Sequence, residues 1–197
     1  MTVRAVIIPG SGANFGSLRQ ACARIGVATE VSDDPARIAA ASHLVLPGVG
    51  AAGHAMRGLR ERGIDRLLPR LAQPLLGICL GMQLLFEASE EDRTECLGVL
   101  PGRVRRLPDA PRWPHMGWNR VQAAPGAPLF DGIDADAWFY FVHGYAAPVG
   151  ATTQASTAYG TAFASAVGDG RVHGVQFHPE KSAAAGRRVL ANFFALR

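Results

Sequence analysis

A Gly-x-Cys-x-Gly turn at residues 77–81 is the feature that most constrains how this chain of 197 residues can fold. Before the turn, residues 74–78 predict a short buried strand, and after it the run 82–86 predicts the start of an apolar helix. A strand, a turn with two glycines and a helix together form the thiol equivalent of the Gly-x-Ser-x-Gly nucleophile elbow. We therefore interpret Cys79 as a nucleophile at a helix N-terminus, where backbone N–H groups favour the thiolate. The alternative is a small cysteine buried beside a tight turn.

The first half of the chain alternates strand and helix signals. Apolar runs predict strands at 3–8, 27–31 and 43–46, and helices are predicted at 18–25, 35–41, 51–62 and 65–71. Asp34 is the expected N-cap of the helix that starts at Pro35. Apolar strands that alternate with helices are typical of a parallel sheet covered on both faces.

The second half of the chain is richer in strands. Strands are predicted at 97–107, 113–121, 137–142, 152–159, 163–167 and 171–177, followed by a helix at 183–196 with Ser182 as its N-cap. We therefore expect an α/β fold with a central, mostly parallel mixed sheet flanked by helices, and with extra antiparallel strands in the second half. The whole chain, residues 1–197, is expected to form a single domain.

Composition and charge exclude several classes of function. The formal charge is +4, but only Lys181 among the 20 basic residues is a lysine, and no aromatic stacking platform accompanies the arginines, so we expect no nucleic-acid partner. The three cysteines form no Cys-x-x-Cys pair, which argues against a structural zinc site and for a reducing compartment. No apolar run approaches the ~20 residues of a membrane span, so a cytoplasmic protein without membrane contact, metal or cofactor is expected.

A second group of chemically useful residues lies near the C-terminus, at His178-Pro179-Glu180. Residues two apart on an extended segment point to the same side, so the imidazole and the carboxylate share a face. A base with an orienting carboxylate is what a cysteine nucleophile requires. The alternative for His178 and Glu180 is an ordinary surface turn.

The elbow and the His-Pro-Glu segment together resemble the class I (triad) glutamine amidotransferases over essentially the whole chain. Within that family, the loop at 46–50 and the segments at 114–119 and 139–145 are similar to those of the glutaminase subunits of imidazole glycerol phosphate synthases. The anthranilate and aminodeoxychorismate synthase relatives are similar at the elbow but carry a different glycine/proline loop. The resemblance implies the three-layer fold of the class I family.

The resemblance also implies an activity, a partner and a set of site residues. The activity is hydrolysis of L-glutamine to glutamate and ammonia without a cofactor. The partner is a (β/α)8-barrel cyclase subunit, joined as a heterodimer, that uses the ammonia to make imidazole glycerol phosphate and AICAR from PRFAR. The implied residues are Cys79, His178 and Glu180 for catalysis; Val49, Gly50 and Leu80 for the oxyanion hole; Gly48, Gln83, His143, Gly144 and Tyr145 for the substrate; and Asn14 and Lys181 for the partner interface.

Some features depart from the family pattern or leave alternatives open. Pro9-Gly10 stands where an aspartate and an aromatic residue are usual, although Gly12 and Asn14 remain, and Gly144 replaces a serine. The glycines around Val49 permit either a peptide flip that switches activity or a plain turn. Trp118 and Tyr145 are expected to cover the mouth of the site or to pack beneath it.

The remaining histidines and cysteines are expected to be bystanders. His43, His54, His115 and His173 are predicted in loops or on helix faces, and Cys22 and Cys96 are predicted to be inert. Three other functions stay open at this point: the glutaminase subunit of another class I amidotransferase, a stand-alone cysteine hydrolase, and a non-enzymatic subunit.

Overall fold

An eight-stranded mixed sheet forms the centre of the protein, whose computed structural model describes residues 3–10, 14–108 and 110–197. The strand order is β2 (Thr29–Val31), β1 (Ala5–Ile7), β3 (His43–Gly48), β4 (Leu75–Cys79), β14 (Val172–Val175), β13 (Thr161–Asp169), β12 (Thr153–Tyr159) and β9 (Gln122–Ala123). The strands from β2 to β14 pair in parallel, and β13, β12 and β9 continue the sheet antiparallel. The predicted mixed sheet is confirmed.

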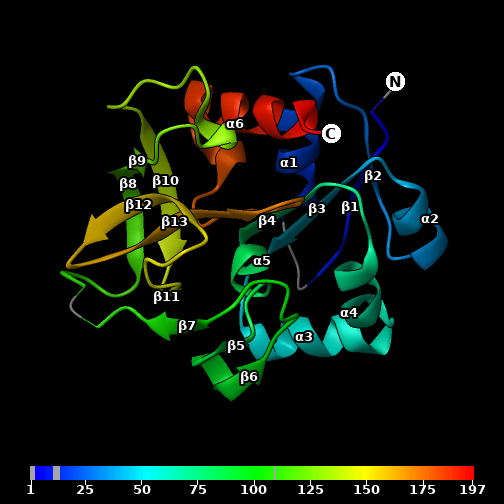
Figure 1. Ribbon diagram of the computed structural model, residues 1–197, viewed down its shortest axis with the longest axis horizontal. Helices are drawn as coiled ribbons and strands as arrows, with labels where there is room; N and C mark the ends of the chain where they lie inside the picture. Colours follow the sequence, from blue (N-terminus) through cyan, green and yellow to red (C-terminus); the bar gives the residue numbers. More distant parts are fainter. Residues whose placement is uncertain (1–2, 11–13, 109) are drawn as a thin grey trace.

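Helices cover both faces of this sheet (Figure 1). One face packs against α1 (Phe15–Ala23) and α6 (Ala183–Ala195), and the other against α2 (Pro35–Ala40), α3 (Ala52–Glu61) and α4 (Ile64–Leu67). The alternation along β1 shows the two cores, because Ala5 and Ile7 pack with α1 and α6 whereas Val6 packs with α2 and α3. The chain therefore has the three-layer α/β architecture that its sequence predicts.

The carboxyl ends of three neighbouring parallel strands meet at one place. Gly48 at the end of β3 pairs with Cys79 at the end of β4, and Val175 of β14 pairs with Ile78. The loops that follow these strands therefore emerge side by side. In open α/β sheets, ligands bind in the crevice outside such carboxyl ends.

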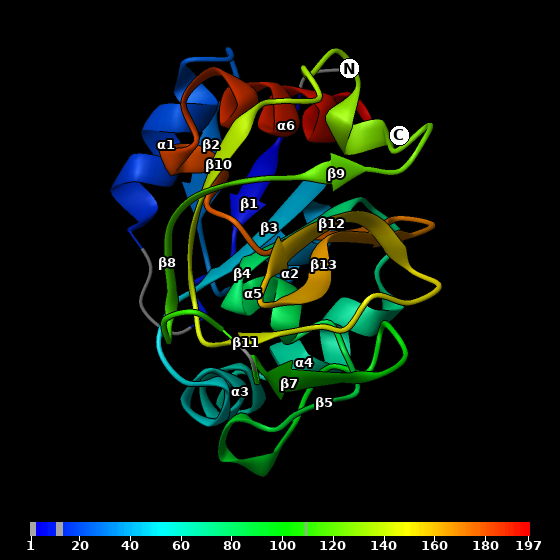
Figure 2. The ribbon, with the colours of Figure 1, turned by 90° about the vertical axis from the view of Figure 1, so that its left-hand side faces the viewer.

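Two smaller sheets stand beside the large one (Figure 2). The first pairs β10 (Trp138–His143) with β8 (His115–Arg120), and the second has the order β11 (Tyr145–Ala146), β7 (Arg103–Arg106), β5 (Ala88–Ser89) and β6 (Thr94–Glu95). Short 3-10 helices complete the chain: η1 (Leu68–Arg70), η2 (Glu91–Arg93), η3 (Pro128–Phe130) and η4 (Pro179–Lys181). The backbone of η4 is tied to β10, because the His178 N–H donates to the Tyr140 carbonyl at 2.9 Å.

The helix after the elbow is much shorter than predicted. The apolar run at 82–86 suggested a sustained helix, but α5 spans only Leu80–Gln83. The carbonyls of Leu84 and Leu85 accept hydrogen bonds from the backbone N–H groups of residues 97, 99 and 100, each at 2.9 Å. This tertiary pairing ends the helix and also shortens the predicted strand 97–107 to β7.

Both predicted N-caps stand at the starts of their helices, but only Asp34 caps its helix with its side chain. The Asp34 carboxylate accepts from the Ala36 N–H at 2.9 Å, as expected for an N-cap. Ser182 precedes α6 but makes no capping bond with its side chain. Its hydroxyl instead donates to the His178 carbonyl at 2.7 Å and accepts from the Tyr140 N–H at 3.0 Å. Ser182 therefore fastens η4 to β10.

Candidate active site

Cys79 lies at a strained turn between β4 and α5. Its φ is +54° and its ψ is −113°, a conformation that non-glycine residues rarely adopt. A Cβ at Gly81 would overlap the Leu46 carbonyl oxygen, and a Cβ at Gly77 would lie 2.7 Å from the Gly81 carbonyl oxygen. Both glycines are therefore required by close packing, and the turn holds Cys79 at the carboxyl end of the sheet.

Cys79 shares a cleft of about 250 Å³ with His178. Nδ1 of His178 lies 2.9 Å from Oε1 of Glu180, and both side chains are more than nine-tenths buried. Nε2 of His178 is buried and makes no hydrogen bond of standard geometry within the described residues. The structure thus brings together the three side chains that the sequence singled out in two distant segments.

The pKa of His178 reflects this arrangement. Burial alone would lower the pKa, but the neighbouring Cys79 and Glu180 outweigh burial and raise it from 6.5 to about 10. An imidazole with so high a pKa is cationic at neutral pH. A cationic imidazole beside a cysteine is the arrangement that activates a cysteine nucleophile.

The residues predicted for an oxyanion hole line the same cleft. Val49, Gly50 and Leu80 all border it, and Leu80 is the first residue of α5. Gly50 has a φ of +89°, so the loop after β3 uses the conformational freedom of glycine. Gly48, which was predicted to bind the substrate, is not among the described residues that line the cleft; it packs closely against the elbow, since a Cβ there would lie 3.1 Å from the Gly81 nitrogen.

The predicted substrate residues Gln83, His143, Gly144 and Tyr145 also line the cleft. Gln83 is buried, and its Nε2 donates to the Tyr145 carbonyl at 2.8 Å and to Oε1 of Gln176 at 2.9 Å. His143 Nδ1 lies 2.9 Å from the same Tyr145 carbonyl. These contacts join the elbow helix α5 to the segment 143–145 and hold both in one arrangement.

Three residues at the site were not singled out from the sequence. Glu91 lines the cleft, accepts from the Ala52 N–H at 2.9 Å, and has a pKa that burial raises. Gln176 is fully buried and its Nε2 lies 3.8 Å from Sγ of Cys79. Trp113 covers Gly144 and donates from Nε1 to its carbonyl at 2.9 Å. Of these three residues, only Gln176 could have been identified from the sequence. It stands two residues before His178, and alternate residues of an extended segment share a face.

Three of the four bystander histidines lie in strands, within the predicted strands 43–46, 113–121 and 171–177, and not in the loops or helix faces expected for these side chains. His43, His115 and His173 are buried in strands β3, β8 and β14, whereas His54 lies on helix α3 as expected. Burial of the first three is possible because each sits in the apolar layers that the strands form, and burial lowers their pKa, that of His115 to about 4. They are therefore neutral at pH 7.

Both remaining cysteines are poor nucleophiles. Burial raises the pKa of Cys22 to about 12 and that of Cys96 to about 11, so both are thiols at neutral pH. This agrees with the expectation that they are inert.

The two residues assigned to an interface make local contacts. The Asn14 side chain accepts from the Ser17 N–H at 3.0 Å and so caps α1, while Lys181 Nζ lies 5.6 Å from the Tyr140 ring. Trp118 is half exposed on β8 and does not line the cleft, whereas Tyr145 does. Gly12 lies outside the described residues.

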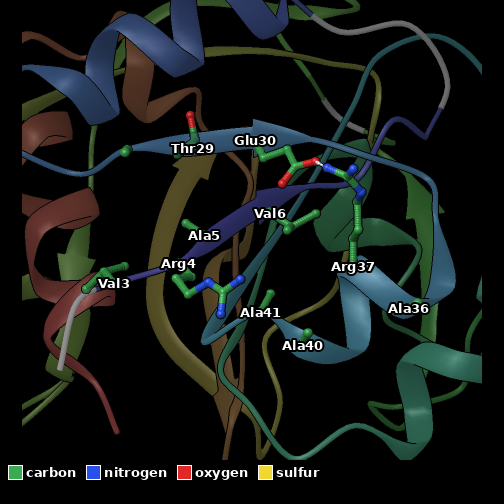
Figure 3. A pocket seen from close by; sticks show the side chains of 11 residues that line it. Val3, Arg4, Ala5, Val6, Thr29, Glu30, Ala36, Arg37, Ala40 and Ala41 are labelled. Atoms are coloured by element: carbon green, nitrogen blue, oxygen red, sulfur yellow. Dashed lines mark hydrogen bonds and ion pairs between the residues drawn. The ribbon is translucent and has the colours of Figure 1, made fainter.

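A larger hollow of about 740 Å³ lies away from this chemistry, between β1, β2 and α2 (Figure 3). Small alanine side chains and Val3 line much of it, and its charged groups are Arg4 and the ion-paired Arg37 and Glu30. It contains no cysteine or histidine, so the smaller cleft is the better candidate for catalysis. Within the described ranges, no group of three or more His, Cys, Asp or Glu is placed to hold a metal ion, and no helix is long and apolar enough to cross a membrane.

Comparison with known proteins agrees with this geometry. Residues 13–196 match the model of the family described as glutamine amidotransferase class-I. The chain belongs to the class-I glutamine amidotransferase family. It is 50% identical to the imidazole glycerol phosphate synthase subunit HisH of Vibrio cholerae over the full length of both proteins. It is 49% identical to the HisH subunit of Xanthomonas axonopodis pv. citri, with 96% of each chain covered.

Solved structures share the fold at low sequence identity. A putative GMP synthase subunit from Thermoplasma acidophilum superposes with a TM-score of 0.76 and 19% identity, covering 98% of this chain and 93% of the other. A structure described as PurLQS from Thermotoga maritima gives 0.69 and 17%, with 98% of each chain covered. These similarities confirm the predicted architecture.

The packing of Trp113 on Gly144 predicts a strong coupling between the two positions. A Cβ at residue 144 would lie 2.5 Å from the indole ring, so Gly144→Ser should reduce the free energy of unfolding by about 1–3 kcal/mol. Removing the ring in the Trp113→Ala background should make the same substitution nearly neutral. Urea denaturation of the two single variants and the double variant measures this cycle; additive losses would contradict the steric account.

The ion pair predicts that His178 stays protonated well above neutral pH. Since folding raises its pKa from 6.5 to about 10, the pair stabilises the folded state fully below pH 6.5 and is lost as the pH rises through 10. Glu180→Gln and Cys79→Ser each remove a group that raises the pKa and should therefore lower it. NMR titration of isotopically labelled histidine checks this, and a neutral His178 at pH 8 in the unmodified protein would refute it.

Proposed function

We propose that this chain is the glutaminase subunit of an imidazole glycerol phosphate synthase and hydrolyses the side-chain amide of L-glutamine. The observation that carries the proposal is the meeting of Cys79 and His178 at one small cleft at the carboxyl edge of the sheet, with Glu180 bound to Nδ1 of His178. Nucleophile, base and orienting carboxylate are the parts that acyl transfer through a thioester requires. The 50% identity to a HisH subunit over the full length supports the choice of substrate.

The reaction proceeds in two halves. In the first, the Cys79 thiolate attacks the amide carbon, and the His178 imidazolium gives its proton to the departing ammonia, which leaves a γ-glutamyl thioester. In the second, neutral His178 takes a proton from water, and the resulting hydroxide attacks the thioester and releases glutamate. The thiolate and imidazolium are then restored. Glu180 holds the ring through Nδ1, so that Nε2 faces the reacting atoms throughout.

The negative charge on the tetrahedral intermediates needs hydrogen-bond donors. Val49, Gly50 and Leu80 line the cleft, and we assign the Leu80 N–H and one backbone N–H of Val49 or Gly50 as these donors. One well-placed donor is worth about 3 kcal/mol in the transition state. The loop with Gly50 at positive φ is suited to a peptide flip, which would let this donor turn toward the substrate only in the active state.

We assign the amino-acid end of glutamine to Glu91, Gln83 and residues 143–145, all of which line the cleft. Glu91 offers a carboxylate to the α-ammonium group from a partly buried position. Gln83 uses its Nε2 on Tyr145 and Gln176, so its Oε1 is available as an acceptor for the same ammonium group. Backbone groups of residues 143–145 remain for the α-carboxylate, in place of the serine hydroxyl that is usual at position 144.

The ammonia that the reaction releases requires a partner subunit that uses it. Ammonia that escapes into water at neutral pH is protonated and is no longer a nucleophile. We assign the partner as a (β/α)8-barrel cyclase that forms a heterodimer with this chain. The barrel receives the ammonia and converts PRFAR into imidazole glycerol phosphate and AICAR.

The outer face of β8 and β10 is suited to bind this partner. Met116, Trp118 and Trp138 lie on it with 63%, 50% and 50% of their surfaces exposed. Exposed aromatic and methionine side chains of this kind are enriched at protein interfaces. Tyr140 and Lys181 continue the face toward η4, so it reaches the segment that carries His178. We assign Lys181 to this interface, with Asn14 as a second candidate from the loop before α1.

Replacement of the nucleophile tests the catalytic part of the proposal. Cys79→Ala should lower glutamate release by at least about 10³-fold, since covalent catalysis is lost. Cys96→Ala is the matched control and should retain activity. Release should be measured enzymatically with purified protein, alone and with the barrel subunit. Unchanged release from Cys79→Ala would contradict the proposed mechanism.

Disruption of the exposed face tests the partner. Trp118→Glu places a charge in the middle of the β8/β10 face and should weaken barrel binding by at least about tenfold, because a buried unpaired charge is costly. Trp113→Phe, outside this face, should bind normally. Analytical ultracentrifugation or calorimetry gives the affinity. Equal affinities for both variants would place the interface elsewhere.

A further inference from the structure

A single backbone carbonyl fixes the direction of the buried amides beside Cys79. The Tyr145 carbonyl can only accept, so the Gln83 group that lies 2.8 Å from it must be the NH₂ end of the amide. The same Nε2 lies 2.9 Å from Gln176, which must therefore present its oxygen to Gln83. The other end of the Gln176 amide, its NH₂ group, is left 3.8 Å from Sγ of Cys79.

A second chain of hydrogen bonds reaches the same carbonyl from the other side. His143 Nδ1 lies 2.9 Å from the Tyr145 oxygen and so carries the proton, which leaves Nε2 to accept from Nδ1 of His115 at 3.0 Å. His115 Nε2 then accepts from the Asn119 amide at 3.4 Å. Burial lowers the pKa of His143 to about 3 and that of His115 to about 4, so neither ring carries a charge that would reverse the chain.

The sulfur needs donors in this structure. Its nearest carbonyl, that of Val142, lies 3.7 Å away and favours the protonated thiol. Helix α5 has only four residues, so its dipole is small. The side chain of Gln176 is completely buried, so bulk water does not compete for its contact with the sulfur.

We propose that Gln176 is a further catalytic residue, whose amide N–H donates to Sγ of Cys79 and stabilises the thiolate. Gln83 and the Tyr145 carbonyl act as positioning groups, because they determine which end of the Gln176 amide meets the sulfur. The role of this contact in turnover rests on the proposed glutaminase reaction. The contact itself is a property of the free protein.

The test is the pH dependence of Cys79 alkylation by iodoacetamide, followed by mass spectrometry of the Cys79 peptide. Gln176→Leu keeps the size of the side chain but removes the donor. Alkylation of Cys79 at mildly acidic pH should become about tenfold slower, because the loss of the donor reduces the thiolate fraction. Ser165→Ala alters a buried hydroxyl on the neighbouring strand β13 and should leave the profile unchanged.

A second variant guards against a merely structural effect. Gln83→Leu leaves Gln176 in place but frees its amide to turn, so Cys79 alkylation at mildly acidic pH should slow by less than in Gln176→Leu. Circular dichroism and thermal unfolding identify the variants that are folded. An unchanged alkylation profile in folded Gln176→Leu, or a profile that moves equally in Ser165→Ala, overturns the proposal.

The alkylation test separates this inference from the proposed function. If the profile shifts in Gln176→Leu, the thiolate contact is supported even when no glutaminase activity is found. If glutaminase activity falls about tenfold in kcat with KM unchanged, the contact also acts in turnover. Loss of activity with an unshifted profile contradicts the thiolate role of Gln176 while leaving the proposed reaction in place.

Discussion

The close contact between the elbow and strand β3 is the constraint on which the site depends. Gly81 lies so near the Leu46 carbonyl that no side chain fits between them, and this contact presses the start of α5 against the sheet. Cys79 absorbs the sharp change of direction in a left-handed conformation. Its sulfur is thereby held where the loops after β3, β4 and β14 emerge together. The strained backbone of Cys79 and the close packing of its neighbour Gly81 therefore act together to fix the position of the sulfur.

Activation of the sulfur comes from side chains rather than from the helix. A four-residue α5 carries little dipole, and the Val142 carbonyl opposes the thiolate. His178, oriented by Glu180, supplies the charge, and the Gln176 amide is placed to supply a neutral donor. Burial strengthens each of these contacts, because solvent does not compete for them. Ser182 adds rigidity by joining the backbone of His178 to β10.

Local sequence signals were sufficient for the elbow and for most of the fold. The glycine pattern marks the turn, and the constraint on Gly77 is local because a Cβ there would meet the Gly81 carbonyl, whereas the constraint on Gly81 comes from the Leu46 carbonyl of β3. Asp34 with Pro35 marks a helix start through local contacts, because the Asp34 side chain caps the helix and proline stands at its first position. The grouping of Cys79 with His178 was also foreseeable from the chemistry they share, although they are far apart in the chain.

Features that depend on tertiary contacts were not foreseeable. The length of α5 is set by hydrogen bonds from residues 97–100, which no local pattern encodes. The sequence predicts that the Ser182 side chain caps α6. Its hydroxyl instead bonds to the His178 carbonyl and to the Tyr140 N–H of β10. Glu91 lies in an ordinary acidic run and reaches the cleft only because η2 packs beside α3. Gly144 stands where a serine is usual in the family. Only the structure shows that the indole of Trp113 occupies the space that a side chain at this position would need.

The most direct measurement of the central claim is covalent labelling with a glutamine analogue that carries an electrophile in place of the side-chain amide. Peptide mass spectrometry then locates the adduct among the three cysteines of the chain. This account predicts a single adduct on Cys79, formed at a rate that saturates with the analogue and is slowed by L-glutamine. Labelling of Cys22 or Cys96 instead, or a rate that glutamine does not affect, would contradict it.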